Sequence, residues 1–129
     1  MTKKFTNRIT RANASKLHKQ VFAILDEIFP LYTIEQEKHV EVYDEKEARH
    51  SLFLDFFIKE LDVAIECQGK QHFEQNDHFH ADSAAFKAQQ HRDYIKKVWC
   101  EMNDITLIEI RYDEKPSKEL IMKKIEEAL

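Results

Sequence analysis

The chain is poor in the residues that cross-link or interrupt a fold: its 129 residues include one glycine, two prolines and two cysteines. The cysteines, Cys67 and Cys100, form no Cys-x-x-Cys pair, so the usual ligand pattern of a structural zinc site is missing. We interpret both as reduced, mostly buried thiols of a cytoplasmic protein.

Long apolar runs are also absent. No segment approaches the ~18–20 consecutive apolar residues of a membrane-spanning helix. No apolar stretch follows the first basic residues, as it would in a secretory signal. We therefore expect an intracellular protein without a membrane partner. A length of 129 residues allows one domain with a real core and is too short for two.

Acidic residues are missing from the start of the chain, although the net charge is −4. Residues 1–25 contain no acidic residue and six basic ones: Lys3, Lys4, Arg8, Arg11, Lys16 and Lys19. We expect residues 1–12 to form a basic arm and residues 13–129 to form a single domain. The arm either contacts nucleic-acid phosphates or serves as a solubilising tail.

Two short apolar runs near the middle of the chain predict a pair of buried strands, at residues 52–58 and 63–68. Each run carries one carboxylate, Asp55 in the first and Glu66 in the second. If residues 59–62 form the connecting loop, the pairing places Asp55 opposite Glu66, with their Cβ atoms about 4.5–5.5 Å apart.

Two like charges this close in an apolar sheet are destabilising, and a hard divalent cation would remove the conflict. We therefore expect Asp55 and Glu66 to hold a metal ion. Gly69, the only glycine, follows at a point where the backbone must turn or let a ligand approach, and His72 comes shortly after it. In the alternative interpretation, one carboxylate is solvated at a strand end, or a one-residue shift places the two on opposite faces.

The rest of the chain predicts helices and strands in a simple order. A helix capped by Asn13 or Ser15 runs to Ile28, just before Pro30. The other elements are an edge strand at 32–43, a long helix at 82–102, a strand at 105–111 and a helix at 118–128. The order α-β-β-β-α-β-α predicts an α/β fold with a mixed central sheet flanked by helices.

The long helix has a face that we expect to rest on the sheet, formed by Phe86, Gln90, Tyr94, Ile95, Val98, Trp99 and Met102. Asp93 and Lys97 return to nearly the same face, where a carboxylate needs either a basic partner or a functional site. Three histidines precede this helix. Together with one histidine on the helix, they form an alternative zinc site: His72, His78, His80 and His91.

The pattern of Asp55, then Glu66-Cys67-Gln68, then Gly69 and His72 resembles the core of PD-(D/E)XK nucleases. More narrowly, it is similar to the branch that holds very-short-patch repair endonucleases and phage homing endonucleases of the EDxHD type. The resemblance covers about residues 15–113 and implies a restriction-endonuclease-like core. It also implies the site residues. The strand aspartate of the branch would be Asp55, the histidine after the next strand would be His72, and the aspartate on the following helix would be Asp93. Glu66 would be the second acid of the wider superfamily.

Two departures from that pattern affect the expected site. Gln68 stands where the superfamily usually has lysine, so the lysine's role is missing or has moved. The first predicted helix lacks the early glutamate of the branch and carries instead Lys16, His18 and Lys19. Glu27 and Glu37 are candidate substitutes for it.

The favoured function is a metal-dependent DNA endonuclease of phage type that nicks or cuts duplex DNA. Asp55 and Glu66 would bind Mg²⁺, and Mn²⁺ is expected to substitute. His72 is the candidate general base, with Asp93 orienting it, because histidine accepts a proton near neutral pH. The positioning and accessory candidates are Gln68, His18 and Glu37.

DNA is the expected partner, and basic side chains are expected to contact its phosphates: Lys3, Lys4, Arg8, Arg11, Lys70, Arg92, Lys96 and Lys97. At this length we expect no appended recognition domain, so high sequence specificity would require a homodimer or another partner. Two other functions stay open. One is an inactive DNA-binding module of the same fold, favoured by Gln68. The other is a metal-binding interaction protein without nucleic acid, favoured by the net negative charge and the histidines.

Overall fold

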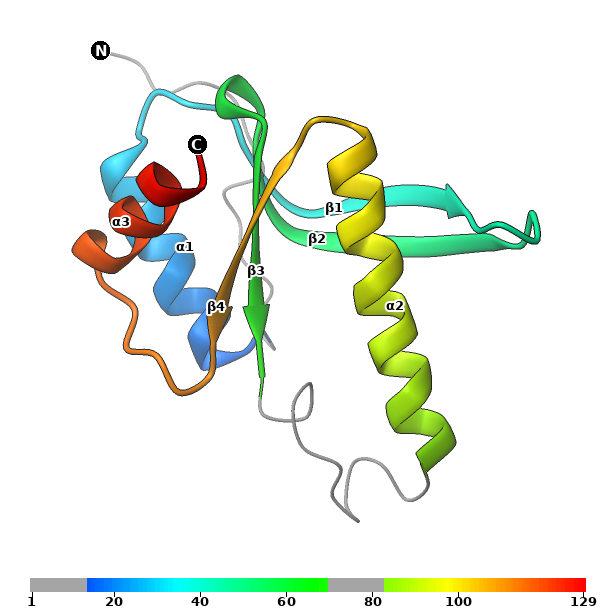
Figure 1. Cartoon of the computed structure of the whole chain (residues 1–129). Helices are drawn as coiled ribbons and strands as arrows, with labels where there is room; N and C mark the ends of the chain where they lie inside the picture. Colours follow the sequence, from blue (N-terminus) through cyan, green and yellow to red (C-terminus); the bar gives the residue numbers. More distant parts are fainter. Residues whose placement is uncertain (1–13, 70–82) are drawn as a thin grey trace.

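The computed structural model describes residues 14–69 and 83–129. Its elements are α1 (Lys16–Ile28), β1 (Ile34–Tyr43), β2 (Arg49–Ile58), the short 3₁₀ turn η1 (Lys59–Leu61), β3 (Val63–Gln68), α2 (Ser83–Met102), β4 (Thr106–Arg111) and α3 (Lys118–Ala128). The predicted α/β class and the order α-β-β-β-α-β-α are confirmed (Figure 1). The predicted basic arm, Lys70 and His72 lie outside the described residues.

The four strands form one mixed sheet in the order β1-β2-β3-β4, so β1 is an edge strand as expected. β2 is antiparallel to β1 and β3, whereas β4 is parallel to β3 and is reached through α2. Such a parallel connection needs a crossover, which a helix normally supplies. No helix in the described part of the chain is long and apolar enough to cross a membrane.

Capping serines fix the starts of two helices. The Ser15 side chain accepts a hydrogen bond from the His18 N–H at 3.1 Å, so Ser15 is the cap of α1. Ser117 caps α3 in the same way, accepting from the Leu120 N–H at 3.0 Å. These caps fix the residues at which α1 and α3 begin.

Helices cover both faces of the sheet (Figure 1). On one face, α1 and α3 pack through Val21, Leu25, Ile121 and Ile125. On the other face, α2 packs through Ile95 and Cys100. β3 is buried on both sides because it lies between these layers, which explains its continuous apolar sequence.

The β1–β2 hairpin reverses its faces partway along its length. Residues separated by an even number of positions in a strand normally point to the same face. On β1, however, Ile34 packs with α1 and Val40 packs with α2. On β2, Phe56 packs with α1 and Leu54 packs with α2. Both strands therefore bend at the same level, and the far half of the hairpin runs beneath α2 (Figure 1).

The bend coincides with Glu37, whose φ of 51° is left-handed. Glu37 lies between the paired positions Gln36–Phe56 and Lys38–Leu54, and is therefore across from Asp55. Left-handed backbone costs an ordinary L-residue about 1–2 kcal/mol. The structure thus places Asp55 at the point where β2 changes direction.

The packing face of α2 is narrower than the sequence predicts. Tyr94 and Met102 are 61% and 78% exposed, and Gln90 is also exposed. The buried residues are Ile95 and Cys100. The expected face combined two adjacent stripes of the helix, and the sheet covers the stripe through Ile95 rather than the one through Tyr94.

We predict that glycine stabilises the protein relative to valine at position 37, and that the order is reversed at position 35. Glu37→Gly should raise the free energy of unfolding by up to about 1 kcal/mol, and Glu37→Val should lower it by about 1–2 kcal/mol, because a Cβ disfavours left-handed backbone. At Glu35, two residues earlier in the same strand, glycine should be the destabilising change. Urea unfolding of the four variants measures this. The same order at both positions would contradict a bend at Glu37.

Candidate functional site

The carboxylates of Asp55 and Glu66 meet where β2 leaves β3, a place that we call the fork. The paired positions of these strands are Ile58–Val63, Phe57–Ala64 and Phe56–Ile65, in the register expected from the sequence. At the next position, Asp55 and Glu66, side-chain carboxylates take the place of backbone carbonyls as hydrogen-bond acceptors. The Asp55 N–H donates to Glu66 Oε2 at 2.7 Å, and the Cys67 N–H donates to Asp55 Oδ2 at 2.8 Å.

This exchange explains how two acids can lie together at the edge of a core. Each carboxylate accepts a backbone N–H that would otherwise lack a ladder partner. These two short hydrogen bonds fix the positions of both side chains. The Glu66 side chain is 7% exposed and that of Asp55 is 32% exposed, so the fork is reached from solvent on the Asp55 side.

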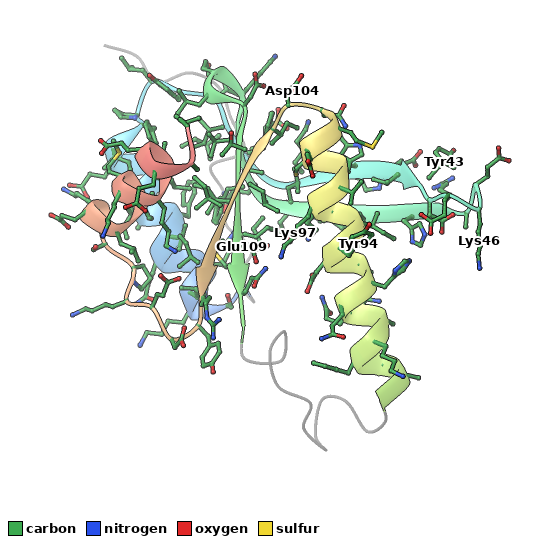
Figure 2. The ribbon with its side chains drawn as sticks, viewed as in Figure 1. Tyr43, Lys46, Tyr94, Lys97, Asp104 and Glu109 are labelled. Atoms are coloured by element: carbon green, nitrogen blue, oxygen red, sulfur yellow. The ribbon has the colours of Figure 1, made fainter. Side chains whose placement is uncertain are left out.

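Lys96 on α2 completes the fork. Its Nζ donates to Glu66 Oε1, and its side chain is only 17% exposed. The sequence predicted Lys96 as a phosphate contact, along with its neighbour Lys97. Lys97 pairs with Glu109 of β4 at 3.3 Å and is 55% exposed (Figure 2). These adjacent lysines thus lie in different environments, and Lys96 is the one beside the carboxylates.

His18 lies behind Asp55, on the α1 side. It is 5% exposed, and its ring is 4.4 Å from the ring of Phe56, centroid to centroid. Its Nε2 is 3.0 Å from Gln36 Oε1, and its Nδ1 is 3.9 Å from Asp55 Oδ1. The second distance is too long for a direct hydrogen bond. The sequence named His18 as an accessory residue, and the structure places it next to the fork.

The buried acid at the fork has an unusual protonation equilibrium. Burial, and then the charge of Asp55, raise the pKa of Glu66 to about 8, although Lys96 opposes the shift. Burial also raises the pKa of the Cys67 thiol far above its usual range, with Asp55 and Glu66 adding to the effect. Cys67 is therefore a neutral thiol, and Cys100, whose pKa burial raises to about 11, is one as well.

The other predicted site residues lie at varying distances from the fork. Asp93 is half-buried on α2, one turn before Lys96, and accepts a hydrogen bond from Gln89 at 3.2 Å. Gln68 is buried at the end of β3. Arg92 is exposed and donates to Gln89 at 3.0 Å. Glu27 pairs with Lys118 of α3 and is not part of the fork.

Two contacts at the fork were not predicted from the sequence: that of Gln36 with His18 and that of Lys96 with Glu66. Gln36 of β1 forms a hydrogen bond with His18. The only sequence feature that could have indicated this contact is a polar residue at a buried strand position. Lys96 could have been noted from its spacing, because it follows Asp93 by three residues on the same helix face. A hollow of about 480 Å³ lies at the end of β3, bordered by Cys67, Gly69 and Lys16, and none of Asp55, Glu66 and Lys96 lines it.

Three viral proteins are similar to about half of the chain. Uncharacterized protein 307L of Invertebrate iridescent virus 6 is 37% identical over 67 residues, which is 52% of this chain and 34% of the viral protein. Uncharacterized protein 033L of Invertebrate iridescent virus 3 is 38% identical over 63 residues, 49% of this chain and 32% of that protein. Uncharacterized protein 094L of Frog virus 3 (isolate Goorha) is 41% identical over 63 residues, 48% of this chain and 41% of that protein.

The chain thus spans about a third to two fifths of the length of these relatives. They come from iridoviruses, not from phages, and so lend no support to the phage-type origin that the resemblance implied. No family model and no solved structure matches the chain.

We predict that Glu66 makes the metal-free protein less stable as the pH rises. Its pKa is higher in the folded than in the unfolded chain, so its contribution is complete below about pH 4.5 and is lost as the pH passes through about 8. In EDTA, wild type should therefore lose stability relative to Glu66→Gln between pH 5 and 8. The difference in free energy of unfolding, Glu66→Gln minus wild type, should increase over this range. Urea unfolding at several pH values measures this difference. Parallel curves for the two proteins would contradict the raised pKa.

Proposed function

We propose that this chain is a divalent-metal-dependent endonuclease that hydrolyses DNA phosphodiester bonds, with a restriction-endonuclease-like core. The observation that carries the proposal is the fork, where Asp55, Glu66 and Lys96 lie together at the end of a strand pair. The confirmed order of elements agrees with that core. The relatives are uncharacterized proteins, so the proposal rests on the residues of this chain.

The donor set at the fork suits a hard divalent cation. Both groups offer carboxylate oxygens, and the charge of each carboxylate disfavours the charge of the other, as the raised pKa of Glu66 reflects. Asp55 and Glu66 would hold Mg²⁺ or Mn²⁺. Such an ion, when bound, supplies positive charge toward the phosphate and lowers the pKa of a water. The 32% exposure of Asp55 leaves the fork open to a substrate.

Lys96 is the proposed carrier of the role that Gln68 cannot fill. Gln68 has no charge and is buried in β3, whereas Lys96 brings an ammonium to Glu66 from α2. A nearly buried ammonium is well suited to offset negative charge that develops on a phosphoryl group. The expected lysine role has, in this proposal, moved from the strand to the helix.

Histidine serves two different purposes in the proposal. His18 is buried and is held by Gln36, so it cannot reach a substrate and instead positions the Asp55 side of the fork. His72 remains the candidate general base, with Asp93 as the residue that orients it. The basic arm and Lys70 remain candidate phosphate contacts.

Removal of either carboxylate should abolish both cleavage and stabilisation by metal. Asp55→Asn and Glu66→Gln should each reduce nicking or linearisation of supercoiled plasmid by a factor on the order of 10³ or more, because several kcal/mol of charge stabilisation is lost. Mg²⁺ should raise the melting temperature of wild type and of neither variant. A wild-type protein that retards plasmid without cutting it would favour the inactive DNA-binding alternative. A protein that neither cuts nor retards it would favour a role without nucleic acid.

The two adjacent lysines provide a matched test of the fork. Lys96→Met should reduce cleavage by a factor on the order of 10²–10³, the usual effect of losing one donor to developing charge. Lys97→Met should leave the rate within a few-fold of wild type, because Lys97 pairs with Glu109. Single-turnover rates at saturating DNA measure both. Equal losses in the two variants would mean that the lysines act only through general attraction to DNA.

A further inference from the structure

A second cluster of metal-binding side chains lies far along the hairpin from the fork. The turn between β1 and β2 is organised by Asp44, whose Oδ1 accepts the N–H groups of Lys46 and Ala48, both at 2.9 Å. The other oxygen, Oδ2, is 2.8 Å from His50 Nε2. The carboxylate is therefore fixed by the backbone, and one of its oxygens faces a histidine.

A second histidine reaches this pair from α2. The rings of His50 and His91 are 5.9 Å apart, centroid to centroid, and approach edge to face. One ligand atom each from Asp44, His50 and His91 lies within 4.8 Å of the others. Since 41 positions separate His50 from His91 in the numbering, this cluster is a tertiary feature. It joins the end of the hairpin to the helix that carries Lys96.

We propose that Asp44, His50 and His91 bind a transition-metal ion of the zinc class. Two imidazoles and one carboxylate are a donor set that zinc accepts, whereas Mg²⁺ prefers oxygen donors alone. Zinc binds these groups at about 2.0–2.2 Å, so tetrahedral ligand atoms lie roughly 3.3–3.6 Å apart. The ligand atoms of the cluster now lie within 4.8 Å of one another, and the Asp44–His50 pair is at 2.8 Å, so these distances bracket that spacing. The zinc site considered from the sequence groups His91 with His72, His78 and His80, and these three residues lie outside the described part of the chain.

The surroundings leave room for a fourth ligand. A hollow of about 260 Å³ borders the cluster and is lined in part by Asp44, His91 and Tyr94. Tyr94 on α2 and Tyr43 on the hairpin lie on this side of the molecule (Figure 2). The fourth position is open to water, as in zinc sites with three protein ligands. The two carboxylates of the fork and this cluster would therefore select different metals.

The bound ion would cross-link the end of the β1–β2 hairpin to α2. In the described residues, the two elements already meet through Val40, Leu54 and Ile95, which lie nearer the sheet. A metal at the turn adds a contact at the far end of the hairpin and orders α2 five residues before Lys96. The site stands independently of the proposed nuclease function, because none of its ligands belongs to the fork.

Zinc binding to single-histidine variants tests the proposal. Affinity is measured by competition with a chromophoric chelator in excess Mg²⁺, and Co²⁺ absorption reports the geometry. His50→Gln and His91→Gln should each weaken binding by a factor on the order of 10² or more, because even a supporting residue contributes 10–100-fold. His39→Gln is the matched control. It changes a histidine on the same hairpin that contacts Ser51 and Phe53 instead, so its affinity should equal that of wild type.

A second control separates this site from the histidines between β3 and α2. A variant with His72, His78 and His80 all changed to Gln should keep the wild-type affinity and the tetrahedral Co²⁺ spectrum. Loss of binding in that variant would assign the metal to the other histidines and overturn the proposal. Wild-type affinity in His50→Gln or His91→Gln would overturn it as well, as would no zinc binding by wild type at millimolar concentration.

Discussion

Two carboxylates held together, one buried and one partly exposed, are the constraint on which the rest of the site depends. Asp55 and Glu66 repel one another, and burial makes the repulsion stronger by limiting the screening that water provides. The chain offsets this with two backbone N–H groups and the Lys96 ammonium. Removal of one member of such a network leaves a buried charge uncompensated, so the fork behaves as a unit. In the proposed function, a divalent cation bound by Asp55 and Glu66 offsets the repulsion that remains.

The fold serves this arrangement through the bend in the hairpin. The backbone pairing of β2 with β3 ends at Phe56 and Ile65. At the next position, the carboxylate oxygens of Asp55 and Glu66 accept the backbone N–H groups in place of backbone carbonyls. The same bend carries the far half of the hairpin beneath α2, which sets the position of that helix. Lys96 then reaches Glu66 from one side of the sheet, and His18 approaches Asp55 from the other.

Much of this could be predicted from the sequence, because local patterns determine it. The uniformly apolar run predicted β3, and the candidate caps Asn13 and Ser15 predicted the start of α1. The two-residue period of strands predicted that Asp55 lies opposite Glu66. The bend escaped prediction because a glutamate occupies a left-handed position that usually belongs to glycine. The place of Lys96 also escaped it, because the rotation of α2 depends on which stripe the sheet covers. The roles of His72 and the basic arm stay predictions, since both lie outside the described residues.

Binding of Mn²⁺ followed by NMR tests most directly whether the fork is a metal site. Paramagnetic Mn²⁺ broadens the resonances of nearby amides. The amides of Asp55 and Cys67 donate to the two carboxylates and should therefore disappear first at substoichiometric metal. The same titration of Asp55→Asn should leave the Cys67 amide sharp. If the Cys67 amide of wild type persists while amides elsewhere broaden, the carboxylates do not bind the ion and the fork is not a metal centre.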